Sequence, residues 1–347
     1  MKEWFEPGPL REALISDGIV LCLLALGIAF GSFVRRNELW REALGAVWRR
    51  RRGAVLVLGV YASVALVDSV VWVSASGASD QVAAHEARSL IDRAFSGARE
   101  KSYSAPFASE EFYDQSRLVQ PGRHPLGTNV LGQDVFYLTL KGSRVALLIG
   151  GLTSLIAIPL ALLFGILAGY FGGFVDDVVF FVMSTLASMP GILLLIALIM
   201  ALGQSTFSVC VALGVTSWVG FCRLSRGETM KLRELDYVAA ARTLGVRPAA
   251  ILVRHILPNL MHLVVITFVL MFSGLVLSEA TLAWLGIGVA GSWGQMIAQA
   301  KDELSREPMV WWNLTGAFAA LFGLLLSVNL VGDALRDVLD PRTRGEG

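Results

Sequence analysis

Few residues of this 347-residue chain stand in an arrangement that could do covalent or metal chemistry. His85 and Glu86 could begin the zinc-binding pattern H-E-x-x-H, but Ser89 occupies the place of the second histidine. The chain contains no Gly-Lys dipeptide, so it has no P-loop that could hold the phosphates of ATP. The sequence therefore predicts a protein that is not an enzyme and that has no catalytic, cofactor or metal site of its own.

Two kinds of reactive group lie inside apolar segments. Glu279 lies in the apolar run 260–286, and a carboxylate at the centre of a bilayer costs about 2.5–3.5 kcal/mol when it faces lipid. The Glu279 carboxylate either faces a polar pathway or a partner, or it extends to the outer membrane interface or caps a helix break. Ser184 and Ser273 could be nucleophiles of an intramembrane hydrolase, but no mid-span histidine or lysine could activate them.

The most informative segment is a charged, helix-prone island at 236–258, between two long apolar stretches. Residues 235–244 are good helix formers, and Gly245 follows at the position where a glycine ends a helix. We expect such an island to be the place where a membrane protein meets a soluble partner.

Composition places this island in a membrane protein. Hydrophobic residues make up 55% of the chain, charged residues 16%, and the mean hydropathy is +0.62, outside the range of soluble domains. A helix needs about 20 apolar residues to cross a bilayer. Seven stretches qualify or nearly qualify: 18–34, 53–74, 143–169, 178–202, 206–222, 260–286 and 313–332. The first could be a span, an uncleaved signal anchor or an interfacial helix. The net charge of +1 by itself says nothing about a partner, and no nucleic-acid partner is expected.

The distribution of arginine and lysine predicts the orientation in the membrane. Segments 35–52 and 223–254 carry seven cations each and are expected in the cytoplasm. Four crossings lie between them, as two segments on one side require. Loops 75–142 and 287–312 then face outward and the C-terminal tail is cytoplasmic. If the stretch at 18–34 spans, the N-terminus faces outward.

Glycine, proline and cysteine residues predict how the spans pack. Gly165 and Gly169 have the GxxxG spacing, which favours tight packing within the chain over a dimer contact. Pro159 and the pair Met189-Pro190 should kink their helices. Three cysteines in or beside apolar runs are expected to be packing residues and not disulfide partners: Cys22, Cys210 and Cys222.

Several motifs occur in a fixed order over about 120–341. They are His124-Pro-Leu-Gly-Thr-Asn129, Gly132-Gln-Asp-Val135, Gly169-Tyr-Phe-Gly-Gly-Phe-Val-Asp176, the island itself, Leu285-Gly-Ile-Gly288, Ser292-Trp-Gly294, Gly332-Asp-Ala-Leu-Arg-Asp337 and Asp340-Pro341. In this order they resemble the inner-membrane permease subunits of ABC importers of the dipeptide/oligopeptide/nickel family. The resemblance implies an all-α polytopic helix bundle with five core spans and one or two N-terminal spans.

In the family that the chain resembles, the island is the EAA loop, a coupling helix seated in a groove of an ATPase subunit. The coupling residues that the resemblance implies are Asp236, Tyr237, Ala239, Ala240, Ala241, Arg242, Gly245, Leu257 and Pro258. Ala239 stands where the family has glutamate, which removes an ionic contact with the ATPase. Gln133 stands where the family usually has arginine.

The implied organisation follows the spans. It comprises an N-terminal apolar segment and basic amphipathic region at 1–52, a span at 53–74, an extracytoplasmic loop at 75–142, a permease core at 143–333 with the coupling loop 223–259, and a cytoplasmic tail at 334–347. Within the extracytoplasmic loop, residues 80–101 are expected to be helical.

The implied function is that of a transmembrane permease subunit of an ATP-driven importer in the cell inner membrane, carrying peptides or similar small solutes. The implied partners are two ABC ATPase subunits that bind the ATP and Mg, a second homologous permease, an extracytoplasmic substrate-binding protein and the lipid bilayer. Glu279, Met189 and Pro190 are candidates for the pathway or its gate. The alternative is a stand-alone secondary transporter or channel, which usually carries polar coupling sites near the midplane of the membrane.

Overall fold

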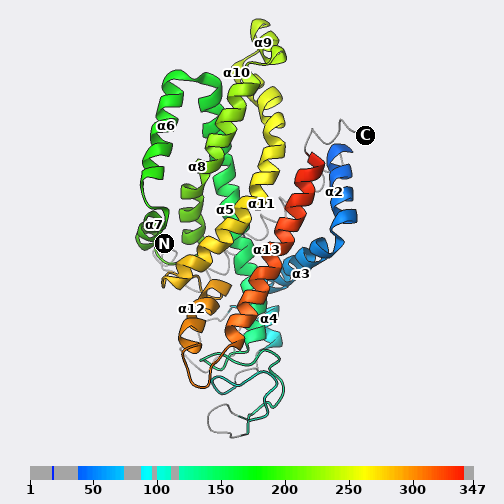
Figure 1. Cartoon of the computed structure of the whole chain (residues 1–347), viewed down its shortest axis with the longest axis vertical. Coiled ribbons are helices and arrows are strands. Elements are labelled where there is room, and N and C mark those ends of the chain that lie inside the picture. Colours follow the sequence, from blue (N-terminus) through cyan, green and yellow to red (C-terminus); the bar gives the residue numbers. More distant parts are fainter. Residues whose placement is uncertain (1–17, 19–37, 74–86, 96–99, 111–116, 340–347) are drawn as a thin grey trace. The chain divides into compact units, whose positions relative to one another are not determined.

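The computed structural model describes residues 18, 38–73, 87–95, 100–110 and 117–339. The described elements are nearly all helical (Figure 1). In chain order they are α2 (Glu38–Arg50), α3 (Arg52–Ser69), β1 (Val71–Val73), β2 (Ala87–Ser89), α4 (Leu90–Ala94), α5 (Val135–Phe171), α6 (Gly173–Ser188), α7 (Gly191–Leu202), α8 (Thr206–Arg233), α9 (Asp236–Thr243), α10 (Pro248–Ile251), the π-helix η1 (Leu252–Ile256), α11 (Leu257–Trp284), α12 (Trp293–Glu303) and α13 (Trp312–Leu339).

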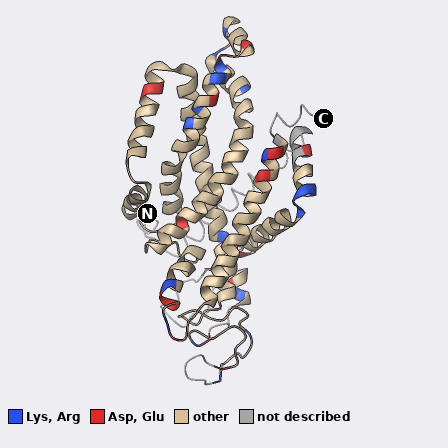
Figure 2. Ribbon diagram, in the orientation of Figure 1, with Lys and Arg blue, Asp and Glu red and all other residues tan. Residues whose placement is uncertain are grey.

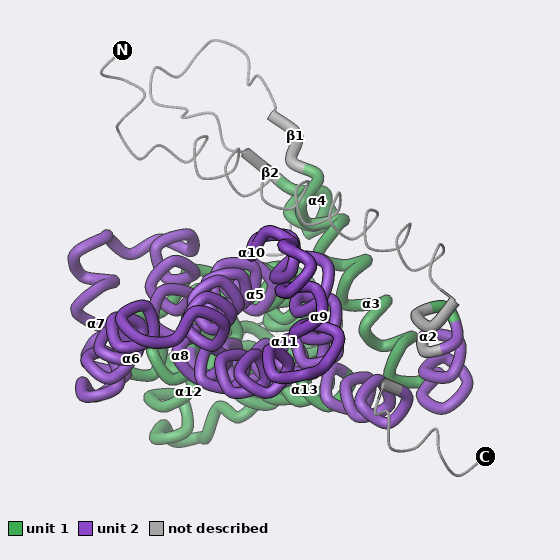
Figure 3. Tube along the Cα trace, turned by 90° about the horizontal axis from the view of Figure 1, so that it is seen from above, with its two compact units in different colours: residues 1–41, 53–148, 279–327 green, residues 42–52, 149–278, 328–347 purple. Residues whose placement is uncertain are grey.

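The chain divides into two compact units (Figure 3). Residues 1–41, 53–148 and 279–327 form unit 1, and residues 42–52, 149–278 and 328–347 form unit 2.

Among the described residues, five helices are long and apolar enough to span a bilayer: α3, α5, α8, the continuous helix from α10 to α11, and α13. Helices α6 and α7 meet the same criterion together and make up to six. Over the described residues from 53 onward, the predicted helical membrane bundle is therefore confirmed, with the short strands β1 and β2 as an exception. Apart from Gly18, the apolar stretch 18–34 lies outside the described residues.

The helix continues through one of the two prolines predicted to cause kinks and is interrupted at the other. Helix α5 runs from Val135 to Phe171 as one helix that contains Pro159. Helix α6 ends at Ser188, Met189 is extended with φ −90° and ψ 140°, and Pro190 precedes the first turn of α7. The axes of α6 and α7 differ by 93°, so the predicted kink at Met189-Pro190 is a sharp break.

In unit 2, glycine lets α5 and α8 approach closely. A Cβ atom placed on Gly165 would collide with the hydroxyl of Ser225, and one placed on Gly169 would lie 2.7 Å from the carbonyl oxygen of Arg226. The Ser225 hydroxyl also donates a 3.1 Å hydrogen bond to the carbonyl of Ala161. The GxxxG pair therefore serves packing within the chain, as predicted.

A hydrophobic core surrounds this contact. Helices α5, α6 and α8 contribute buried residues that include Ala157, Met183, Phe221 and Cys222. Cys210 and Cys222 are buried thiols, as expected of packing residues, and Cys22 lies outside the described residues.

In unit 1, aromatic side chains join helices through their polar tips. The hydroxyl of Tyr61 on α3 donates a 2.8 Å hydrogen bond to the carbonyl of Ala320 on α13. The indole N–H of Trp293 on α12 donates to the carbonyl of Thr139 on α5, also at 2.8 Å. The rings of Tyr61 and Trp293 meet edge to face, with their centroids 5.8 Å apart. These contacts bury large apolar rings and satisfy their polar groups at the same time.

The helix predicted over 80–101 is wrong for part of its described residues. Strands β1 and β2 pair antiparallel, with Val71 opposite Ser89. Ser89 donates a 2.7 Å hydrogen bond to the buried carboxylate of Asp68 and caps α4 in a capping box with Asp92. These contacts hold Ser89 in an extended conformation, so the described helix in this segment is confined to Leu90–Ala94.

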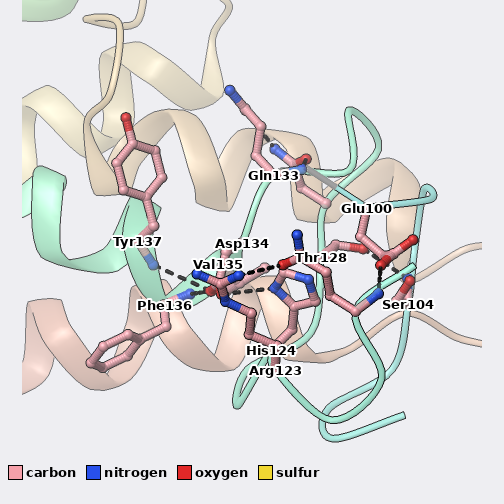
Figure 4. A network of polar contacts seen from close by, with 12 residues as sticks. Glu100, Ser104, Arg123, His124, Thr128, Gln133, Asp134, Val135, Phe136 and Tyr137 are labelled. Carbon is pink, nitrogen blue, oxygen red and sulfur yellow. Dashed lines mark hydrogen bonds and ion pairs between the residues drawn. The ribbon is translucent and has the colours of Figure 1, made fainter. Parts of the chain in front are cut away.

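The loop that precedes α5 is ordered by a polar network (Figure 4). One oxygen of Asp134 accepts the N–H groups of Phe136 and Tyr137 at the start of α5, and the other lies 2.8 Å from Nδ1 of His124. The backbone N–H of Ser104 donates to the hydroxyl of Thr128 at 2.8 Å. The motif from His124 to Val135 thus fixes where the long helix α5 begins.

Candidate functional site

The predicted coupling island forms the short helix α9, which two residues separate from the end of α8. Gly245 has φ +75° and its N–H donates to the carbonyl of Arg242, while the N–H of Val246 donates to the carbonyl of Ala241, both at 3.1 Å. These two bonds make a Schellman motif, which requires a left-handed residue that glycine adopts at least cost. The predicted glycine C-cap is confirmed.

One face of α9 is fixed in a hydrophobic core. Val238 and Ala241 are buried, three residues apart and therefore on the same side of the helix. They pack with buried residues of α5, α10, η1 and α11: Ile166, Ile251, Ile256 and Leu260. The burial of this face sets the orientation of the opposite face.

The opposite face of α9 is exposed. Most of the predicted coupling residues lie on it or beside it: Asp236, Tyr237, Ala239, Ala240, Arg242 and Gly245. Leu244 is 82% exposed and was not among the predicted residues, although its spacing of four from Ala240 places it on the same face. The island thus presents small side chains beside one large apolar side chain.

Leu257 and Pro258 lie at the junction of η1 and α11. Pro258 has no N–H, and inside a helix its ring would clash with the carbonyl of Arg254, four residues earlier. The chain widens into π-helical geometry at this point, and the N–H of Leu257 donates to the carbonyl of Leu252, five residues earlier. The two residues therefore shape the helix that packs against α9, with Leu257 half-buried and Pro258 exposed.

Basic residues are frequent at the end of unit 2 that contains the end of α8, α9 and α10 (Figure 2). Several of them are exposed: Arg223, Lys231, Arg242, Arg247 and Arg254. The surface around α9 is therefore cationic, with Glu234 and Asp236 as exposed acids beside it.

The three residues predicted for the pathway or its gate differ in exposure and lie in different units. Met189 and Pro190 are exposed at the break between α6 and α7 in unit 2. Glu279 belongs to unit 1 and is 4% exposed, with its carboxylate facing the Ser292 hydroxyl and the backbone N–H of Val289. A Cβ atom on Gly294 would lie 2.9 Å from Oε2 of Glu279. The carboxylate therefore faces the turn that leads into α12.

Residues 161–345 match the family described as binding-protein-dependent transport system inner membrane component. The chain belongs to this family. The glutathione transport system permease protein GsiD of Pectobacterium atrosepticum is 34% identical over 70% of this chain and 81% of that protein. The oligopeptide transport system permease protein OppC of Bacillus subtilis is 31% identical over 69% of this chain and 80% of that protein. A solved structure of the MetNI methionine ABC transporter in an inward-facing conformation is 18% identical, covering 59% of this chain and 97% of its own, with a TM-score of 0.47.

Family membership makes this permease a multi-pass inner-membrane transport subunit and not an enzyme. Members work with a binding protein, as the family description states, and in general with ATPase subunits. The alternative of a stand-alone secondary transporter or channel is not favoured.

Proposed function

We propose that the exposed face of α9 is the surface through which ATPase subunits drive this permease. The observation that carries the proposal is the fixed orientation of α9, with Val238 and Ala241 held in a core while Ala240 and Leu244 face outward. Small side chains allow close approach and a protruding leucine fits an apolar pocket, as in helix-in-groove recognition. A helix held this firmly passes an applied force to the spans beneath it.

The orientation proposed for the membrane places α9 and the C-terminus in the cytoplasm. Segments 35–52 and 223–254 carry seven cations each, which favours the cytoplasmic side for both. Helices α3, α5 and α8 and the pair α6–α7 give four crossings between them, which is consistent with one side. The loops that contain α4 and α12 then face outward, where a substrate-binding protein would dock.

The proposed transporter contains two ATPase subunits, a second homologous permease and an extracytoplasmic binding protein. ATP and Mg²⁺ would bind to the ATPase subunits, since this sequence has no P-loop. The named activities of the relatives support peptides or similar small solutes as the cargo. Met189 and Pro190 are proposed to line the pathway, because backbone groups at a break need polar neighbours in the membrane. Glu279 is proposed to hold the outer turn before α12 at the mouth of the pathway.

Two substitutions on the exposed face of α9 test the docking proposal. In a complex purified gently from membranes, we expect Ala240→Trp and Leu244→Glu to lower binding-protein-stimulated ATPase activity by about tenfold, because either change blocks close approach or buries a charge. Insertion of the permease should be unchanged. Ala62→Trp, the same change at an exposed position of α3, is the matched control. Normal uptake and stimulation in both α9 variants would count decisively against the proposal, as would a wild-type complex without ATPase subunits.

A further inference from the structure

The start of α6 is tied to α8 by an ion pair that belongs to neither the α9 core nor its exposed face. Nε and Nη2 of Arg226 each donate to one carboxylate oxygen of Asp176 in the first turn of α6. The two side chains are 27% and 20% exposed, so they are largely shielded from water. A bidentate guanidinium–carboxylate pair fixes orientation as well as distance.

A second arginine holds the other side of the same turn. Arg233, at the end of α8, donates a 2.9 Å hydrogen bond to the carbonyl oxygen of Gly169, one of the last carbonyls of α5. Gly172 and Gly173 reverse the chain here with φ of +64° and +51°. The turn from α5 to α6 is therefore attached to α8 on both sides.

Helix α9 is attached to the same turn from its own side. The guanidinium of Arg242 on α9 lies 5.8 Å from the ring centroid of Tyr170, next to Gly169. Since only two residues separate Arg233 from the start of α9, the end of α8, the turn and α9 form one cluster of contacts. A displacement of α9 therefore reaches the turn directly.

Few apolar contacts hold α6 in place. Of its 16 residues, Val179 and Met183 are buried, whereas large side chains such as Phe174 and Phe181 are exposed. With so little buried surface, the position of α6 depends strongly on its polar attachment at Asp176. Helix α6 leads directly to the 93° break at Met189-Pro190.

We propose that Asp176 and Arg226 form a positioning clamp that makes α6 move together with α9, so that force entering at α9 is delivered to the α6–α7 break. The proposal rests on the proposed function of α9. It assigns to Asp176 a role in coupling hydrolysis to transport, in addition to any role in folding.

The test measures solute transported per ATP hydrolysed by the complete complex in proteoliposomes. Asp176→Asn and Arg226→Gln should assemble and hydrolyse ATP, while the amount of solute per ATP falls about tenfold. The exchange Asp176→Arg with Arg226→Asp should restore part of the coupling. Asp177→Asn removes a charge from the adjacent exposed position and should leave coupling unchanged.

A distance measurement distinguishes a role of the Asp176–Arg226 pair in coupling from a role in folding alone. Spin labels at two exposed positions, Ala187 on α6 and Leu224 on α8, should keep one separation with and without ATP in the otherwise wild-type complex. In the Asp176→Asn background, the separation should change with nucleotide. A merely structural ion pair would not produce this nucleotide dependence.

Three results would overturn the clamp: normal coupling in both neutral variants, a label separation that does not change with nucleotide in the Asp176→Asn background, or an exchange variant that assembles but regains no coupling. These outcomes are distinguishable from failure of the docking proposal. Uncoupling by Ala240→Trp together with normal coupling in Asp176→Asn would reject the clamp and retain the docking surface. Normal coupling in Ala240→Trp would reject the docking surface itself.

Discussion

The phenol ring of Tyr237 on α9 lies 6.0 Å from the imidazole ring of His255 in the π-helix η1. The side-chain amide of Asn259 donates to the Tyr237 hydroxyl at 3.2 Å and to the His255 carbonyl at 2.6 Å. Because α9 has eight residues, it depends on such contacts as well as on its core for its orientation.

Removal of the Tyr237 ring should loosen α9. We expect Tyr237→Ala to lose a ring contact of about 0.5–1.5 kcal/mol and to speed amide hydrogen exchange across α9 several-fold. Tyr237→Phe keeps the ring and loses one exposed hydrogen bond, so its effect should be smaller. Hydrogen exchange of peptides that cover α9 measures both, and equal effects of the two variants would contradict the role assigned to the ring.

Substitution of Gly245 should destabilise the end of α9 through backbone strain alone. The residue has φ +75° and a Cβ atom there would meet nothing within 4 Å. Gly245→Ala should therefore cost about 1–2 kcal/mol, and Gly245→Asn less, because asparagine tolerates left-handed geometry better. The rate of hydrogen exchange at the Val246 amide measures this loss of stability, because that amide takes part in the Schellman motif. Full protection of that amide in the alanine variant would show that the Schellman motif is dispensable.

Alanine at Gly165 of α5 should destabilise unit 2, whereas alanine at Gly220 of α8 should not. A Cβ atom on Gly165 would collide with Ser225, an overpacking that typically costs 1–3 kcal/mol, about the amount that shifts a melting temperature by a few degrees. Gly220 is exposed and has nothing within 4 Å of its Cβ position, so Gly220→Ala should stabilise α8 by about 0.5–1 kcal/mol. Thermal unfolding in detergent compares them, and a neutral Gly165→Ala would refute the close α5–α8 contact.

Stability should depend on the protonation of Glu303 at the end of α12. Burial raises the pKa of this carboxyl, against the opposing effects of the 2.9 Å hydrogen bond from Asn313 and the charge of Arg306. Because the folded pKa exceeds the unfolded one, the stabilisation is complete below the unfolded pKa and is lost as pH rises through the folded pKa. The melting temperature should fall over that range.

Glu303→Gln should remove this pH dependence and raise the melting temperature at neutral pH, since the amide carries no charge to bury. Glu307→Gln, four residues on and exposed, is the matched control. If the melting temperatures of wild type and Glu303→Gln depended on pH in the same way, Glu303 would not be the group responsible.

The sequence predicted the spans well because apolar length is a property of consecutive residues. It was less accurate at helix ends. Helix α5 begins at Val135, eight residues before the expected 143, because Asp134 caps its first turn. Helix α8 continues to Arg233 instead of ending near 222, because Arg226 and Arg233 find partners on neighbouring elements.

The sequence could predict those features of the candidate site that depend on residues close together in the chain. The C-cap at Gly245 follows from one residue, whereas the Arg226–Asp176 pair joins positions 50 apart and needs the fold to bring them together. Leu244 was missed because a leucine within a helical pattern gives no sign of its exposure until the buried partners of Val238 and Ala241 are known.

The break between α6 and α7 limits what can surround it. With 16 and 12 residues, the two helices are about 24 Å and 18 Å long, so neither alone crosses a hydrocarbon layer of about 30 Å. The carbonyl groups of the last turn of α6 and the N–H groups of the first turn of α7 that lack intrahelical partners would then lie at a depth where acyl chains offer no hydrogen bond. The α6–α7 break must therefore contact water or a neighbouring subunit and not the acyl chains of the bilayer.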